Sequence, residues 1–463
     1  MGSAEPTERG AVEAAGSSAM NAEYRIQALL RGRTTDSLLQ WSGRMHLADL
    51  DGFRPYPHVM REARSALQES GLTVDRVGRF GFSLRGSLRQ VGQVMGVSPS
   101  RLLAAARPSE ARQAFFPANS PWSRLLLGWE VLPAPETMAA LRAPPALPYP
   151  TLDGDALRKH LSVPSGLAGA GVRVAVIDSG LDCTHPWFVA QGWVLKTGTY
   201  GGSDRPDLDL DGHGTAMAWC IKTVAPQCEL IAYRLTNPVD AIETAADEGA
   251  HVISCSWGWL GENRISHNLE ASIESVIRDD RCTVLFPSGN NHRIWPGTMP
   301  SVLSVGGVHA DPVTGHRQPS DFSAAYFSHV YPGRSVPDVC GLCGQLPKGV
   351  YLVMPCPPNS RMDREYAAKP YPIGDDTAPD DGWMVASGTS AATAQVAGAA
   401  ALLIEHLNTR GVLQVPADIK SRLMRSALPV LNRCNSLPVP SIPGGVQAAG
   451  CGLVSVTAAL QLP

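Results

Sequence analysis

A serine at the start of an alanine- and leucine-rich stretch is the first residue that could do chemistry. Ser390 lies in SGTSAATAQVAGAAALLIEHL, where a short glycine-bracketed opening leads into a sequence typical of a long helix. The free N–H groups and the dipole of a helix start favour negative charge that develops on an oxygen. A serine hydroxyl is a weak nucleophile at neutral pH and needs a base within hydrogen-bond reach. Without such a base Ser390 would only cap the helix, because serine is a favoured cap residue.

A base and an acid that could serve this serine precede it in the chain. His213 lies in DGHGTAMA between two glycines, which let the backbone turn sharply and expose the imidazole. Asp178 ends the apolar run VRVAVID. Each residue alone has an ordinary explanation, as a structural histidine and a turn aspartate. Together with Ser390 they supply a nucleophile, a base and a group that orients the base, in the order Asp, His, Ser with spacings of 35 and 177 residues.

Short apolar runs must position these side chains. Five of them are nearly continuous, so that both faces of the expected strand are apolar: VRVAVIDSG, CELIAYRL, HVISCSWG, RCTVLFPSGN and PSVLSVGGV. Such runs are typical of a parallel sheet covered by helices. Helical segments such as PVDAIETAADEGA and ASIESVIRDD lie between them, which predicts a doubly wound, mostly parallel α/β sheet with helices on both faces. In such a sheet active sites lie at the carboxyl ends of the strands, where the polar residues stand here.

From about residue 160 onward the sequence resembles the subtilisin-like (S8) serine proteases. IDSGLD, DGHGTAMA and GTSAATAQVAG resemble the aspartate, histidine and serine motifs of that family, in the family's order. The resemblance implies that Asp178, His213 and Ser390 form a catalytic triad. It also implies that Asn290, in PSGNN, completes an oxyanion hole with the Ser390 backbone N–H. SCSWG resembles the strand that pairs with an extended substrate, and the implied substrate-binding residues are Ser256, Trp257, Gly258, Ser288 and Gly289.

The activity that this resemblance implies is that of a serine endopeptidase, which hydrolyses peptide bonds through an acyl-enzyme. Two alternatives remain open. An acyl-enzyme can be resolved by an amine instead of water, so the chain could be a maturation protease or a macrocyclase (transpeptidase) acting on a ribosomal precursor peptide. The third alternative is a non-catalytic peptide-binding module. The chain has Ala394-Gln395 where the family usually has Pro-His, which concerns specificity rather than activity. Residues 340–382 read as an insertion.

The first third of the chain has a different pattern. Residues 1–22 are small, polar and acidic, and we interpret them as a disordered tail or an expression scar. Residues 23–135 predict a small ferredoxin-like α+β domain, in which EYRIQALL is a strand, YPHVMREARSALQESGL a helix, TVDRVGRF and GFSLRGS a hairpin, and SLRQVGQVMGV a second helix. Residues 136–160 are expected to be a Pro/Ala-rich linker, and residues 161–463 the subtilisin-like catalytic domain.

The element order of the N-terminal domain resembles the propeptides of subtilisin-like proteases. That resemblance implies an intramolecular inhibitor and chaperone whose last segment lies in the active-site cleft. The alternative is a permanent domain that recruits the substrate.

Composition excludes several classes of partner. A net charge of -3 without a long basic run argues against nucleic acid and against an anionic membrane surface. The longest apolar run is about nine residues, too short to span a bilayer. No secretory signal is seen, so we expect a cytoplasmic protein, with a secreted form left open. The ten cysteines all follow residue 182 and are expected to be reduced thiols.

No cofactor is expected to be required. Asp207, Asp209 and Asp211 match the opening of an EF-hand loop, but Ala218 stands where the bidentate glutamate belongs. A solvated acidic loop is the simpler interpretation, and a structural calcium ion remains an open alternative. Three cysteines spaced C-x₂-C-x₁₂-C over residues 340–356 hint at zinc, but a fourth ligand is not obvious, so no metal-binding residue is predicted.

Overall fold

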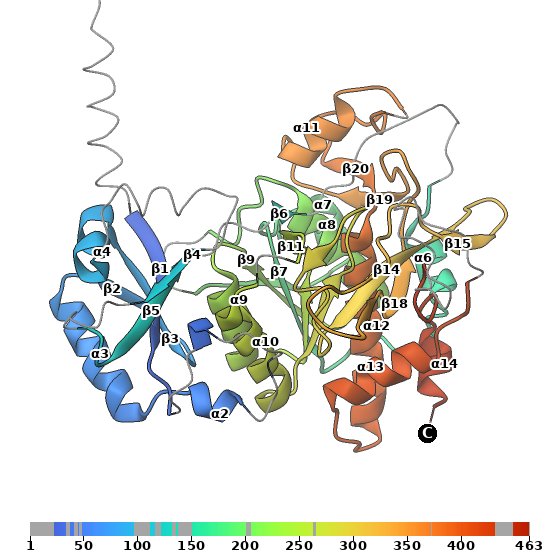
Figure 1. Cartoon of the computed structure of the whole chain (residues 1–463). Coiled ribbons are helices and arrows are strands. Elements are labelled where there is room, and N and C mark those ends of the chain that lie inside the picture. Colours follow the sequence, from blue (N-terminus) through green and yellow to red (C-terminus); the bar gives the residue numbers. More distant parts are fainter. Residues whose placement is uncertain are drawn as a thin grey trace, which may run out of the picture. The chain divides into compact units, whose positions relative to one another are not determined.

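Two compact units make up the computed structural model of this chain (Figure 1). One comprises the described residues up to 134 with Tyr200 and residues 266–272, and the other comprises the remainder. The residues that the structure describes are 23–33, 38–40, 45, 49–96, 112–115, 122–131, 136–137, 151–200, 205–262, 265–371, 373–430 and 448–462.

The N-terminal unit is built on an antiparallel sheet with the strand order β2-β3-β1-β5-β4. Its elements are β1 (Glu23–Leu30), η1 (Leu38–Gln40), α2 (Leu50–Phe53), α3 (Pro57–Glu69), β2 (Thr73–Val77), β3 (Gly81–Ser87), α4 (Leu88–Met95), β4 (Arg112–Phe115) and β5 (Leu126–Val131). The predicted strand, helix, hairpin and second helix are confirmed. The ferredoxin-like assignment of the whole unit stays a prediction.

Local sequence explains where the two longer helices of this unit begin and end. Pro57 occupies the first turn of α3, where its missing N–H costs nothing, and Gly71 follows the helix with a φ of +84°. Ser87 and Gln90 form a capping box at the start of α4, in which each side chain bonds to the other residue's backbone N–H. The apolar faces of these helices join the buried residues of β1, β3 and β5 in one core.

A larger sheet carries the second unit, with the order β15-β14-β12-β10-β7-β9-β8 and with β18 beside β14. All neighbours are parallel except β14 and β15. The strands are β7 (Arg173–Asp178), β8 (Leu195–Gly198), β9 (Glu229–Arg234), β10 (Val252–Cys255), β12 (Thr283–Pro287), β14 (Leu303–Ala310), β15 (Arg317–Pro319) and β18 (Val339–Leu342). Five of them are the predicted apolar runs, so the predicted fold class is confirmed.

Helices cover this sheet, and Figure 1 shows α12 on one side of it and α9 and α10 on the other. The helices are α6 (Gly154–His160), α7 (Pro186–Ala190), α8 (His213–Val224), α9 (Pro238–Asp247), α10 (His267–Asp279), α11 (Arg361–Ala367), α12 (Thr389–Thr409), α13 (Pro416–Arg425) and α14 (Val456–Leu460). α12 is buried from residue 389 to 404 and packs against α8, β10, β12, β14 and β18. A Cβ at Gly398 would lie 2.7 Å from Cβ of Val224, so glycine permits the close approach of α12 to α8.

Short strands complete the second unit. They are β6 (Glu136–Thr137), β11 (Trp257–Leu260) and β13 (Ile294–Trp295), in the order β13-β11-β6, and the antiparallel pairs β16 (Tyr326–Phe327) with β17 (Ser335–Val336) and β19 (Leu352–Pro355) with β20 (Trp383–Ala386). The range predicted as an insertion, 340–382, therefore contains β19 and α11. Within the predicted linker range, Asp153 caps α6 and Leu157 is buried against the main core, a helix that the Pro/Ala-rich composition did not predict.

The cysteines that the structure describes are all free thiols. Among the described residues, the structure contains no helix that combines the length and the apolar character needed to cross a bilayer.

Candidate active site

A buried histidine and aspartate meet at the carboxyl edge of the large sheet. Asp178 is the last residue of β7 and His213 is the first residue of α8. His213 Nδ1 lies 2.7 Å from Asp178 Oδ1, and the two side chains are 3% and 1% exposed. Gly212, with a φ of +96°, turns the backbone into α8, and a Cβ there would lie 2.7 Å from Oγ of Ser360. The glycine before the histidine is thus required by the crowded turn.

The electrostatic surroundings of His213 favour its protonated form. Burial lowers the pKa of His213. The charge and the hydrogen bond of Asp178, together with the charges of Asp211 and Asp209, raise this pKa by more than burial lowers it. The pKa therefore lies above the ordinary value of 6.5. Since a neutral imidazole donates from only one nitrogen, a hydrogen bond from Nδ1 to Asp178 leaves Nε2 as an acceptor.

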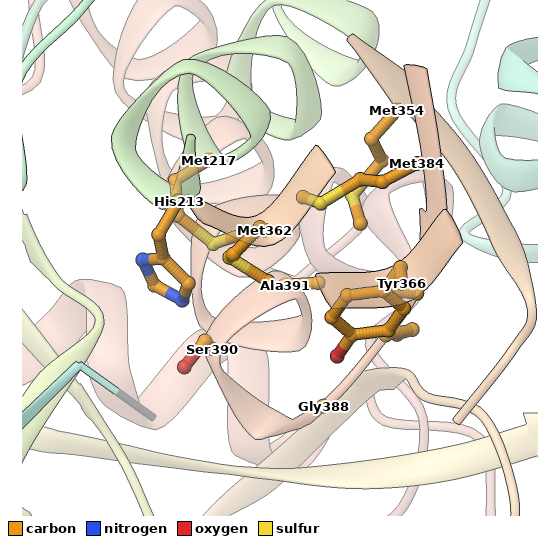
Figure 2. Close-up of a pocket in the computed structure, with 11 residues that line it drawn as sticks. His213, Met217, Met354, Met362, Tyr366, Met384, Gly388, Ser390 and Ala391 are labelled. Carbon is orange, nitrogen blue, oxygen red and sulfur yellow. The ribbon is translucent and has the colours of Figure 1, made fainter. Parts of the chain in front are cut away.

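Ser390 is the second residue of α12, which begins after Gly388. Its Oγ donates to the carbonyl oxygen of Ser256 at 3.2 Å, and Oγ of Ser256 donates to the Ser390 carbonyl at 3.0 Å. This reciprocal pair fixes the start of α12 against the end of β10. His213 and Ser390 line the same pocket (Figure 2), and His213 is hydrogen-bonded to Asp178, so the three predicted residues lie in one region of the structure.

Asn290 is held in one orientation by the residue before Ser390. Its Oδ1 accepts from the backbone N–H of Thr389 at 2.9 Å and from Oγ1 of Thr389 at 2.8 Å, and the side chain is fully buried. With Oδ1 engaged, the amide nitrogen is directed to Gly388, where an added Cβ would lie 2.9 Å from Nδ2. Sequence reasoning did not identify Thr389 as a positioning residue. The signal was its place between the glycine and the serine of GTS.

The predicted substrate strand lies next to this centre. β11 pairs antiparallel with β13 on one edge and with β6 on the other, where Trp257 is opposite Thr137 and Gly258 is opposite Glu136. The Trp257 indole is buried and donates to the carbonyl of Ile177 in β7 at 2.9 Å, and contact of this ring with a substrate stays a prediction. The predicted role of β11 therefore rests on its backbone.

The other two predicted substrate-binding residues follow β12. The Ser288 N–H donates to the Val305 carbonyl at 2.8 Å, and the Gly289 carbonyl accepts from the Ala324 N–H at 2.9 Å. These bonds occupy part of the backbone of both residues. Their contact with a substrate stays a prediction.

Comparison with known proteins identifies the family. Residues 169–449 match the model of the Subtilase family, which is more than half of the chain. The chain belongs to the subtilase family. It is 31% identical to a thermophilic serine proteinase of Bacillus sp. (strain AK1) over 161 residues, 30% of this chain and 39% of the relative. It is 28% identical to an alkaline protease of Alkalihalobacillus alcalophilus over 207 residues, 37% of this chain and 52% of the relative.

A solved structure of a subtilisin-related enzyme resembles this subtilase over most of its length. Fervidolysin from Fervidobacterium pennivorans, described as a keratinolytic enzyme related to subtilisin, aligns with a TM-score of 0.54 and 17% identity over 96% of this chain and 61% of that chain. At this identity the likeness shows the fold. The subtilase described here spans between about two fifths and half of the length of the two curated relatives.

Asp209, which was not predicted as a site residue, connects the turn after Asp178 to the start of α8 through hydrogen bonds. Asp209 is buried, and its Oδ1 accepts from Ser179 Oγ and from the Gly212 N–H, both at 2.8 Å. Its Oδ2 accepts from the N–H and from Oγ1 of Thr215 at 2.8 and 2.6 Å. Burial raises the pKa of Asp209, and these donors offset part of the rise. The sequence pattern that could have indicated Asp209 is the run of aspartates before DGHG, but this pattern is equally typical of a solvated acidic loop.

The neighbouring aspartates of that pattern also have protein partners. Both oxygens of Asp211 accept from Arg361, at 2.7 and 3.2 Å, and both oxygens of Asp207 accept from Arg205 at 2.9 Å. A calcium loop needs several carboxylate oxygens directed at one point. With their oxygens engaged by arginine and backbone donors, these carboxylates do not fit a calcium site as they are placed.

Proposed function

We propose that this subtilase is a serine endopeptidase in which Ser390 is the nucleophile, His213 the general base and Asp178 the residue that orients the base. The observation that carries the proposal is the buried 2.7 Å hydrogen bond between His213 and Asp178, beside the Ser390 hydroxyl at a helix start. A buried carboxylate at Nδ1 fixes the tautomer whose Nε2 can accept a proton. Family membership supports the same assignment.

The proposed mechanism has two acyl-transfer steps. His213 Nε2 takes the proton of Ser390 Oγ while Oγ attacks the peptide carbonyl carbon, and Asp178 stabilises the imidazolium that forms. The oxyanion accepts hydrogen bonds from Asn290 Nδ2 and the Ser390 N–H. When the C–N bond breaks, His213 gives its proton to the leaving amine. Water then attacks the acyl-enzyme by the same route and releases Ser390.

The proposed binding mode is an extended peptide on the edge of β11 that β6 occupies in this structure. Main-chain hydrogen bonds to a strand edge bind a peptide regardless of most of its side chains. The pairing of β6 with β11 supports this mode, because β6 is itself an extended segment on that edge.

Reaction with a fluorophosphonate probe tests the assignment. The wild-type chain should become labelled at Ser390 and should cleave members of a peptide library, whereas Ser390→Ala should do neither while keeping its circular dichroism spectrum and melting temperature. Peptide cleavage by a pure, folded Ser390→Ala protein would overturn the triad.

We further propose that the N-terminal domain is an inhibitor whose last segment takes the place of a bound peptide. β6 follows this domain directly in the chain and occupies the edge of β11 on which a substrate would lie. Self-cleavage between residues 133 and 161 would then free the strand.

Intact mass of wild type and Ser390→Ala, purified side by side, tests this role. We expect a wild-type chain shortened by that cleavage and a full-length mutant. If both stay full length and the wild type is active, a domain that recruits the substrate replaces the inhibitor.

A further inference from the structure

A pocket opens beside Ser390, and none of its lining residues belongs to β11. Its cavity volume is about 10 Å³, the room of one water molecule, and the rest of its space opens to solvent. Figure 2 shows His213, Ser390 and Met217 at one side of it and Met354, Met384 and Tyr366 at the other, with Met362 between them. The methionines are Met217, Met354, Met362 and Met384. Among the lining residues only His213 is titratable near neutral pH.

The methionines converge from four elements. Met354 and Met384 are register partners of β19 and β20, so their side chains share one face of that pair. Met362 and Tyr366 are one turn apart on α11 and share one face of the helix. Met217 stands one turn after His213 on α8. The pocket wall is therefore assembled largely by the insertion between β18 and α12.

Hydrogen bonds fix α11 to the loop that carries His213. The N–H groups of Arg361 and Met362 donate to the carbonyls of Leu210 and Asp211 at 2.9 and 2.8 Å. The Arg361 side chain adds its bidentate bond to the Asp211 carboxylate. These contacts hold the methionine wall at a fixed place relative to His213.

The position of the pocket identifies the part of a substrate that meets it. The leaving amine must lie next to His213, from which it takes a proton, and His213 lines the pocket. The direction of β6 also indicates that the pocket meets the part of a substrate after the scissile bond. From Glu136 opposite Gly258 to Thr137 opposite Trp257, this segment runs toward Ser256, which contacts Ser390. A peptide bound in the same direction passes Ser390 and leaves β11 with the residue that follows the scissile bond.

We propose that this pocket binds an apolar side chain, such as leucine, methionine or phenylalanine, on the residue that follows the scissile bond. The proposal rests on the proposed endopeptidase function. Methionine side chains are apolar and flexible, so a wall of them adapts to apolar groups of different shape. A charged side chain would lose its hydration there without gaining a partner.

Partition of an acyl-enzyme between water and added amines measures this preference directly. p-Nitrophenyl acetate acetylates Ser390 and releases p-nitrophenol. The acetyl group then goes to water, or to an amine whose nitrogen attacks the acetyl carbon as the Oγ–C bond breaks and Oγ regains its proton through His213. Leucinamide, methioninamide, phenylalaninamide, glycinamide and aspartic acid amide are the acceptors, and mass spectrometry counts acetylated amide against acetate.

We expect leucinamide and methioninamide to capture the acetyl group about tenfold more often than glycinamide or aspartic acid amide. Met362→Asp should remove this advantage, measured as the ratio of acetylated amide to acetate. Ala368→Asp, which adds the same charge at the exposed end of α11, is the control and should keep the advantage. Met384→Ala should enlarge the pocket and shift the preference from leucinamide toward phenylalaninamide.

The outcomes separate the two proposals. If no turnover depends on Ser390, the proposed function fails and the pocket assignment fails with it. If turnover depends on Ser390 but wild type uses all amides equally, only the pocket assignment is overturned. If Met362→Asp does not fold, Met384→Ala decides, and an unchanged amide preference in that variant overturns the assignment.

Discussion

The two sides of Ser390 are built from different parts of the chain and offer different groups. On one side β11, which follows β10 of the large sheet, offers backbone N–H and C=O groups. On the other side β19, α11 and β20 offer methionine side chains. Backbone groups hold a peptide with little regard to its sequence, whereas a pocket selects a side chain. From the proposed function and the proposed pocket together, we expect the residue after the scissile bond to affect the selectivity of this subtilase.

Replacing the base His213 should have the largest effect, and it should abolish activity regardless of how the substrate is bound on either side of Ser390. His213→Ala removes the base of Ser390, so both fluorophosphonate labelling and peptide cleavage should disappear. In subtilisin, loss of the catalytic histidine costs roughly 10⁶ in kcat. The measurement is the labelling rate with matched protein concentrations. Undiminished labelling would mean that another base serves Ser390.

Asn290→Ala should have the next largest effect. Its hydrogen bond forms as charge develops on the oxyanion, so kcat should fall while KM stays nearly constant; for the corresponding asparagine of subtilisin the loss is about 10²–10³. Because this residue acts on the carbonyl, the preference among amine acceptors should not change. A raised KM at unchanged kcat would instead make Asn290 a ground-state binder.

In the pH profile of kcat/KM, the midpoint on the acid side should be the same for substrates with different leaving groups. His213 accepts a proton only when neutral, and its pKa is raised above 6.5, so activity should fall below a midpoint above pH 6.5, roughly tenfold per pH unit. Asp211→Asn removes one of the charges that raise this pKa, so the midpoint should move to lower pH. A midpoint that differs between leaving groups would indicate a second titrating residue in the pocket.

Gly258→Ala should have the smallest effect and should confine it to the β11 side. An added Cβ would lie 2.9 Å from the Trp295 carbonyl oxygen, so β11 must shift slightly. A shift that costs about 1 kcal/mol of peptide binding raises KM roughly fivefold. The partition between amine acceptors should stay at its wild-type value. A changed partition would show that the two sides are not independent.

The sequence determined the reactive centre because local rules place each of its members. Asp178 ends an apolar strand, His213 is released by a glycine turn, and Ser390 opens a helix, so each backbone position follows from neighbouring residues. Strand order in a parallel sheet then brings the strand ends to one edge. The fold class was predictable for the same reason, since buried parallel strands are apolar on both faces.

Tertiary structure alone decided what surrounds that centre. Asp209 read as part of a solvated acidic loop, yet it is buried and accepts four hydrogen bonds from three residues. The residues that line the methionine pocket lie between positions 213 and 391, and no periodicity relates them along the chain. Burial and convergence of side chains depend on which elements pack together. A sequence records the residues of such a site, and only packing brings them to one place.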